Sequence, residues 1–81
     1  MNLYSIYDLK ANEYGPVFEA KNDAVACRMC KNEFGKVPKD ALADYVLYQV
    51  GEFSHDIGCV AEYKNEVCDV SDVFPAEEVK Q

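Results

Sequence analysis

One helical segment, flanked on both sides by segments with strand character, constrains the fold of this chain more than any other feature. Within residues 24–34 the apolar side chains recur on one helical arc. Asn22 and Asp23 supply N-cap oxygens before it, and Gly35 is a natural residue to end the helix. Glu33 alone breaks the pattern, because an ideal helix would place it inside the apolar arc. Since one helix can cover only one face of a sheet, we expect a two-layer α+β fold.

Strand patterns lie before and after this helix. Residues 3–9 alternate with a period near two, and residues 17–20 favour a return strand after a turn at 11–16, which predicts a hairpin. Residues 45–53 are rich in β-branched and aromatic side chains, and residues 59–63 favour a partner strand. The sequence therefore predicts a ββαββ order: an antiparallel sheet of two hairpins with one helix packed on a face. The other face is expected to be solvated or used for self-association.

Charge and hydropathy suggest a boundary after Tyr63. The chain of 81 residues has a net charge of −7, and residues 52–81 carry eight acidic side chains against two lysines. We therefore expect a globular domain at 1–63 and an acidic tail or docking arm at 64–81. No apolar run is long enough to span a bilayer, and the N-terminus lacks the pattern of a signal peptide, so the expected compartment is the cytoplasm.

The cysteines raise the question of a metal site. Cys27 and Cys30 form a close pair, with Cys59 and Cys68 as further thiolates, and four cysteines are enough for structural zinc. However, the close pair falls within a helix rather than on a tight turn, and the second pair is widely spaced. We expect free thiols and no metal or other cofactor; zinc and redox roles are the alternatives.

Catalytic chemistry finds little support in the sequence. His55 lies between Ser54 and Asp56, and three consecutive side chains diverge rather than converge as a catalytic triad requires. Glu77 and Glu78 lie in a polar segment without a pocket to shift their pKa values. The four glycines are dispersed, so there is no phosphate-binding loop. We expect a protein that binds rather than an enzyme.

Two surfaces are candidates for binding. The first combines basic side chains near the helix with tyrosines of the strands, which could contact phosphates and stack on bases. Its residues are Lys21, Arg28, Lys31, Tyr4, Tyr7, Tyr45 and Tyr48. The second is the acidic C-terminal segment, where apolar anchors among acids could dock on a partner. Its residues are Val67, Val70, Val73 and Phe74. A solvating tail, or a tail that mimics phosphates, is the alternative reading of that segment.

The N-terminal half and the second hairpin resemble a known family. The runs YSIYDLK (4–10), GPVFEAKNDAVA (15–26) and DYVLYQVGEF (44–53), with the turn DIG (56–58), resemble the small nonstructural protein of gokushovirus-type microviruses. These are bacteriophages with single-stranded DNA genomes. The resemblance covers roughly residues 3–60 and implies a role in viral DNA synthesis or packaging, in the cytoplasm of an infected bacterium. It brings no catalytic residues.

The leading hypothesis is therefore a non-enzymatic phage accessory protein that handles single-stranded viral DNA, alone or with viral replication or capsid proteins. The alternative is an acidic interaction module that binds a host or viral protein through its tail or uncovered sheet face, without contacting DNA. No membrane contact is expected, and an uncovered sheet face with edge strands favours a homodimer.

Overall fold

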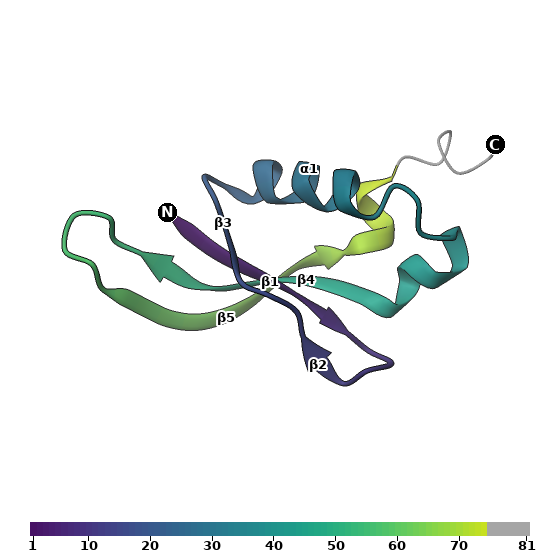
Figure 1. Cartoon of the computed structure of the whole chain (residues 1–81), viewed down its shortest axis with the longest axis horizontal. Coiled ribbons are helices and arrows are strands. Elements are labelled where there is room, and N and C mark those ends of the chain that lie inside the picture. The colour runs from purple at the N-terminus through teal and green to yellow at the C-terminus, as the bar shows by residue number, and fades with distance from the viewer. Residues whose placement is uncertain (75–81) are drawn as a thin grey trace.

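The computed structural model describes residues 1–74. Its elements in chain order are β1 (Asn2–Asp8), β2 (Glu13–Tyr14), β3 (Phe18–Ala20), α1 (Asp23–Glu33), the 3₁₀ helix η1 (Lys39–Asp44), β4 (Tyr45–Phe53), β5 (Val60–Asp69) and the 3₁₀ helix η2 (Val70–Val73). Figure 1 shows α1 along one face of the sheet, with the β4–β5 hairpin extending past the end where the helix begins.

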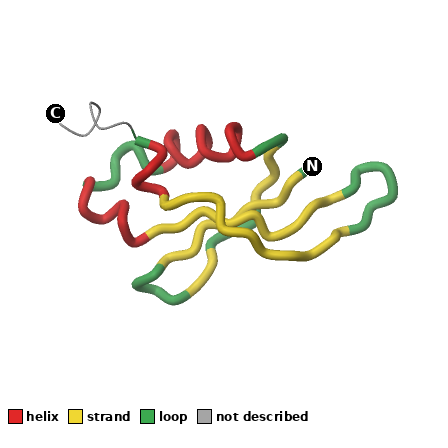
Figure 2. The backbone as a smooth tube through the Cα atoms, turned by 180° about the vertical axis from the view of Figure 1, so that it is seen from behind, coloured by secondary structure: helices red, strands yellow, loops and turns green. Residues whose placement is uncertain are grey.

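The strands form one five-stranded antiparallel sheet in the order β2-β1-β4-β5, and β3 also pairs with β1. β1 is therefore central, with β2 and β3 along one side and β4 along the other. Seen from behind, in Figure 2, the strands lie together on one side of the helical segments. The α+β fold predicted from the sequence is confirmed, and β2 is an additional short strand inside the predicted turn at 11–16.

The helix begins where the sequence indicated. The side-chain oxygen of Asn22 accepts a hydrogen bond of 2.9 Å from the Val25 amide, which satisfies one of the free N–H groups of the first turn. At the other end, the Phe34 amide donates to the Cys30 carbonyl. Gly35 follows but does not adopt a positive φ, so it does not form the left-handed cap that glycine often provides.

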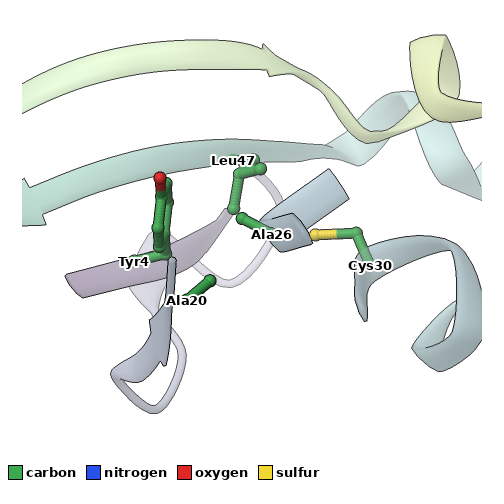
Figure 3. Close-up of a cluster of buried hydrophobic side chains, with 5 residues drawn as sticks. All are labelled: Tyr4, Ala20, Ala26, Cys30 and Leu47. Carbon is green, nitrogen blue, oxygen red and sulfur yellow. The ribbon is translucent and has the colours of Figure 1, made fainter. Parts of the chain in front are cut away.

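The core lies between α1 and the sheet. Its buried residues are Tyr4, Ala20, Ala26, Cys30 and Leu47 (Figure 3). The two alanines have small side chains, which allow the helix to approach the strands closely. Tyr4 is fully buried, and its hydroxyl donates a hydrogen bond of 2.6 Å to the Asp23 carboxylate at the start of α1. Burial and this hydrogen bond raise the pKa of Tyr4 to about 12.

The predicted domain boundary after Tyr63 is wrong. β5 continues to Asp69, and η2 follows it and packs against α1. Val70 is fully buried, and Val67 and Val73 pack against the core. These valines supply apolar contacts that a short helix over a small sheet would otherwise lack, so the fold extends to Val73. Residues 75–81, the rest of the predicted tail, lie outside the described residues.

Candidate nucleic-acid interface

Three tyrosines and one lysine gather on the sheet face that α1 does not cover. Tyr7 and Tyr48 alternate along their strands with core residues that pack toward the helix, so their rings lie on the opposite face. Tyr14 on β2 is the direct cross-strand partner of Tyr7. Lys64 reaches these rings from β5. We call Tyr7, Tyr14, Tyr48 and Lys64 the tyrosine face.

The three rings contact one another. The ring centroids of Tyr7 and Tyr14 are 4.6 Å apart with a tilt of 52°, and those of Tyr14 and Tyr48 are 5.6 Å apart in an edge-on arrangement. Tyr7 and Tyr48 are 6.5 Å apart, also edge-on. Edge-on packing is favourable for aromatic rings and leaves part of each ring accessible. Tyr14 is the most open of the three, with 40% of its surface exposed.

Lys64 lies over this cluster. Its ammonium nitrogen is 5.2 Å from the centre of the Tyr14 ring and 5.4 Å from that of Tyr48, both within the range of a cation–π contact. The same nitrogen donates a hydrogen bond of 2.8 Å to the Tyr14 hydroxyl. This hydrogen bond and the charge of the neighbouring phenols raise the pKa of Lys64. The tyrosine face therefore combines accessible aromatic surface with one fixed positive charge.

Acidic side chains flank that charge. Glu66 is the cross-strand partner of Tyr48, and Glu62 lies two residues before Lys64 on β5. Both residues are exposed. The electrostatic attraction of this surface for a polyanion is consequently small, and any binding of nucleic acid has to draw mainly on stacking.

The structure separates the tyrosines of the predicted interface into three groups. Tyr7 and Tyr48 belong to the tyrosine face. Tyr4, by contrast, is fully buried beneath α1, so its predicted role in stacking on bases is wrong. Tyr45 is half-buried on the helix side of the sheet, where its ring packs against Phe34 at a centroid distance of 4.8 Å. Because side chains of successive strand residues point to opposite faces, these tyrosines cannot form one surface.

The predicted basic residues lie on the helix side. Lys21 lies two residues before the start of α1, and Arg28 and Lys31 are on it. Since α1 packs on the face opposite the tyrosine face, these bases and Tyr7 or Tyr48 cannot contact one short stretch of nucleic acid. The predicted combination of helix bases with strand tyrosines is therefore divided between two sides of the molecule.

Two residues of the tyrosine face were missed by the sequence analysis. Tyr14 falls in a segment with strong turn signals, and Lys64 falls in the segment predicted as a tail. They meet only because β1 pairs with both β2 and β4, and β4 pairs with β5. One sequence signal could have indicated that the strand continues past Tyr63: the charged residues Glu62, Lys64 and Glu66 recur at every second position.

The predicted partner-docking residues of the C-terminal segment pack on the protein itself. Val70 is fully buried, Val67 and Val73 contact the core, and Phe74 is half-buried. A partner could reach these side chains only by displacing η2 from α1. In the structure these side chains stabilise the fold itself, and their role in docking on a partner stays a prediction.

The cysteines are free thiols. The sulfur atoms of Cys27 and Cys68 are 3.9 Å apart, Cys30 is buried nearby, and Cys59 is exposed. Burial raises the pKa of Cys30 to about 11 and that of Cys68 to about 12, so both keep their protons at neutral pH. Within residues 1–74, no group of three or more His, Cys, Asp or Glu side chains is placed to hold a metal ion.

His55 takes part in a contact that the sequence did not indicate. Its ring nitrogen lies 2.5 Å from a carboxylate oxygen of Glu19, and its ring packs edge-on against Phe53. The hydroxyl of neighbouring Ser54 instead accepts a hydrogen bond from the Ile57 amide within the loop. The histidine thus links the β4–β5 loop to β3.

The fold and this surface define a small two-layer α+β protein with one helix-covered face and one aromatic face. None of the helices in residues 1–74 is long and apolar enough to cross a membrane. A family model described as "Phage ORF5 protein" matches residues 1–73, and the chain belongs to this family of phage proteins. No curated protein and no solved structure matches the chain.

Proposed function

We propose that the chain is a non-enzymatic accessory protein of a gokushovirus-type microvirus, which assists the synthesis or packaging of single-stranded viral DNA by binding it on the tyrosine face. It acts in the cytoplasm of the infected bacterium. Two observations support this setting: membership of a phage protein family, and the resemblance of residues 3–60 to the nonstructural protein of those viruses.

The arrangement of Tyr7, Tyr14 and Tyr48 carries the proposal. Proteins that bind single strands without sequence preference stack bases on aromatic side chains, and each stacked base contributes about 1–3 kcal/mol. Tyr14 is exposed and Tyr48 half-buried, and they meet on a sheet face that the helix leaves uncovered. We expect a base that stacks on Tyr14 to displace the Lys64 ammonium, which now lies over that ring, and to leave it available to pair with a phosphate.

The charge distribution determines how such binding should behave. One lysine flanked by Glu62 and Glu66 gives a small electrostatic contribution, and the net charge of −7 opposes the approach of DNA. We therefore expect weak binding of a short stretch, with little preference between bases. The salt dependence should be shallow, close to that of one phosphate contact.

The test is fluorescence anisotropy of a labelled oligothymidine titrated with the full chain at two salt concentrations. Tyr14→Ala should weaken binding about fivefold or more, because one stacked base is lost. Lys64→Gln and Arg28→Gln form a matched pair, since each removes one exposed positive charge, from opposite sides of the sheet. The proposal requires that only Lys64→Gln reduces the affinity and the salt dependence.

The opposite results have clear meanings. If Arg28→Gln weakens binding and Tyr14→Ala does not, the DNA lies on the helix side and the tyrosine face is excluded. No binding even at low salt would instead favour the interaction with a viral or host protein, through a surface other than the packed C-terminal valines.

A further inference from the structure

A groove with a volume of about 430 Å³ opens at the end of the molecule where α1 ends. Its walls are the last turns of α1, the end of β1 with β2 and the connection to β3, and the start of β4. This volume falls within the roughly 300–1,000 Å³ typical of sites that hold small ligands. The groove lies on the helix side of the sheet and shares no residue with the tyrosine face.

The floor of the groove is apolar. Ile6 and Phe18 contribute from the sheet, and Met29 and Phe34 from α1 and its end. Met29 is 39% exposed although it belongs to the apolar arc of the helix. The ring of Phe34 is held against Tyr45, which fixes that wall. An apolar side chain of a partner could thus be removed from water here without rearrangement of the core.

The rim of the groove is acidic. Asp8, Glu13 and Glu33 line it, and no lysine, arginine or histidine of residues 1–74 does so. Asp8 is held in place because its carboxylate accepts the Lys10 and Ala11 amides, at 3.0 and 3.1 Å. The carboxyl end of α1, which ends at Glu33, adds the negative end of the helix dipole.

Glu33 is poorly placed for the stability of the helix. It interrupts the apolar arc, and its charge has the wrong sign for the last turn of a helix, where cations are favoured. A carboxylate at this position adds to the negative potential at the apolar floor, which also contributes to the raised pKa of buried Cys30. The residue that breaks the sequence pattern is therefore one that gives the groove its charge.

We propose that this groove binds a basic peptide segment of a partner protein, with one large apolar side chain in the groove and flanking arginines or lysines paired with Asp8, Glu13 and Glu33. Charge complementarity identifies the occupant: an apolar floor with an acidic rim suits a cationic segment, and the same rim repels phosphates. The groove is thus a second binding site, independent of the tyrosine face.

The probes are three capped peptides, titrated by calorimetry into the full chain at low salt: Arg-Arg-Leu-Arg-Arg, Glu-Glu-Leu-Glu-Glu and Arg-Arg-Ser-Arg-Arg. The first should bind and the second should not. The third should bind at least about tenfold more weakly than the first, because it lacks the apolar side chain that is buried in the groove. Binding of the first peptide should weaken as salt rises.

Variants locate the site. Glu33→Gln and Glu13→Gln should each weaken the leucine peptide about two- to fivefold, as expected for exposed ion pairs. Glu62→Gln on β5 removes the same charge away from the groove and is the matched control. Met29→Gln makes the floor polar and should reduce the difference between the leucine and serine peptides.

Several results would overturn the proposal. Two of them are equal binding of the acidic and basic peptides, and no binding of any peptide. Another is an effect of Glu62→Gln as large as that of Glu33→Gln, which would show that binding depends only on the overall negative charge of the protein. A further one is concentration-dependent self-association that Met29→Gln abolishes, since the occupant would then be a second copy of this chain. Amide NMR shifts on adding the leucine peptide should be confined to residues 6–18, 29–34 and 45. Shifts centred on β5 would also reject the proposal.

Discussion

Tyr4 and Tyr14 lie on opposite faces of the same sheet and have opposite surroundings. Tyr4 is fully buried under α1, and its hydroxyl donates to a carboxylate at the helix start. Tyr14 is 40% exposed, and its hydroxyl accepts from the ammonium of Lys64. The helix-covered face uses tyrosine as a core side chain whose hydroxyl is satisfied internally, by Asp23 as acceptor and Asn2 as donor. The tyrosine face uses the same residue as accessible aromatic surface.

The comparison separates stability from binding. In the core beneath α1, side chains are almost completely buried, so most substitutions there leave a cavity or an unpaired polar group. On the tyrosine face, side chains pack mainly on one another and are partly exposed to solvent, so substitutions there should reduce stability less. If the two faces really differ in this way, substitutions of similar size should have different consequences on each.

The largest expected effect is that of Leu47→Ala, at the centre of the core. Leu47 is fully buried, and truncation should lower the free energy of unfolding by about 2–5 kcal/mol. Tyr14→Ala removes a larger side chain but should lower the free energy of unfolding less, by about 1–2 kcal/mol, because 40% of the residue is already exposed. Urea denaturation monitored by circular dichroism gives both values. Equal losses would show that the tyrosine face is part of the core.

The second effect appears at alkaline pH. Tyr4 has a pKa of about 12 in the folded protein, against an ordinary value of 10.0. Between these values the unfolded chain has lost this proton and the folded protein keeps it, so stability falls as pH rises from 10 to 12. The loss from this group is on the order of 2 kcal/mol.

Tyr4→Phe is the control for that titration. It removes the titrating hydroxyl, so its stability should fall less steeply than that of the wild type over the same range. Cys30 and Cys68, with pKa values of about 11 and 12, act in the same direction from about pH 9 upward in both proteins. Identical slopes for the two proteins would mean that Tyr4 titrates at its ordinary pKa.

Much of this fold could be predicted because local signals and tertiary contacts agree. β4 has its predicted bounds, since its β-branched and aromatic residues favour a strand in any context. The helix is displaced by one residue at each end from the predicted range. β5 was predicted to end at Tyr63 because Lys64, Asn65 and Glu66 are polar, whereas the strand continues to Asp69. Polar residues suit an exposed edge strand, whose pairing with β4 depends on backbone hydrogen bonds rather than on side chains.

The candidate site was less accessible to prediction. Tyr14 and Lys64 are fifty residues apart, and only the register of several strands brings them into contact. Tyr4 is a different case. The period-two pattern placed it on the face opposite Tyr7, so the sequence did contain the reason why both could not stack on the same DNA.

The third effect distinguishes the hydroxyls of Tyr4 and Tyr14 by their contributions to stability. Tyr4→Phe leaves the Asp23 carboxylate without its buried donor and should lower the free energy of unfolding at neutral pH by about 1–2 kcal/mol. Tyr14→Phe removes a hydrogen bond with Lys64 that is exposed to water, and should change it by less than about 0.5 kcal/mol. Chemical denaturation at pH 7 compares them. A larger loss for Tyr14→Phe would reverse the contrast between the faces.

The smallest expected effect has the opposite sign. Glu33→Gln removes a negative charge from the last turn of α1 and should raise the free energy of unfolding by about 0.3–1 kcal/mol. If Glu33 served only folding, its replacement would not raise the stability of the protein. If it serves the acidic groove, a gain in stability on replacement is expected. The informative result is therefore the pair of measurements on one variant: a small gain in stability by urea denaturation together with weaker binding of the arginine–leucine peptide. A loss of stability would instead make Glu33 a structural residue, and the acidic rim would then rest on Asp8 and Glu13 alone.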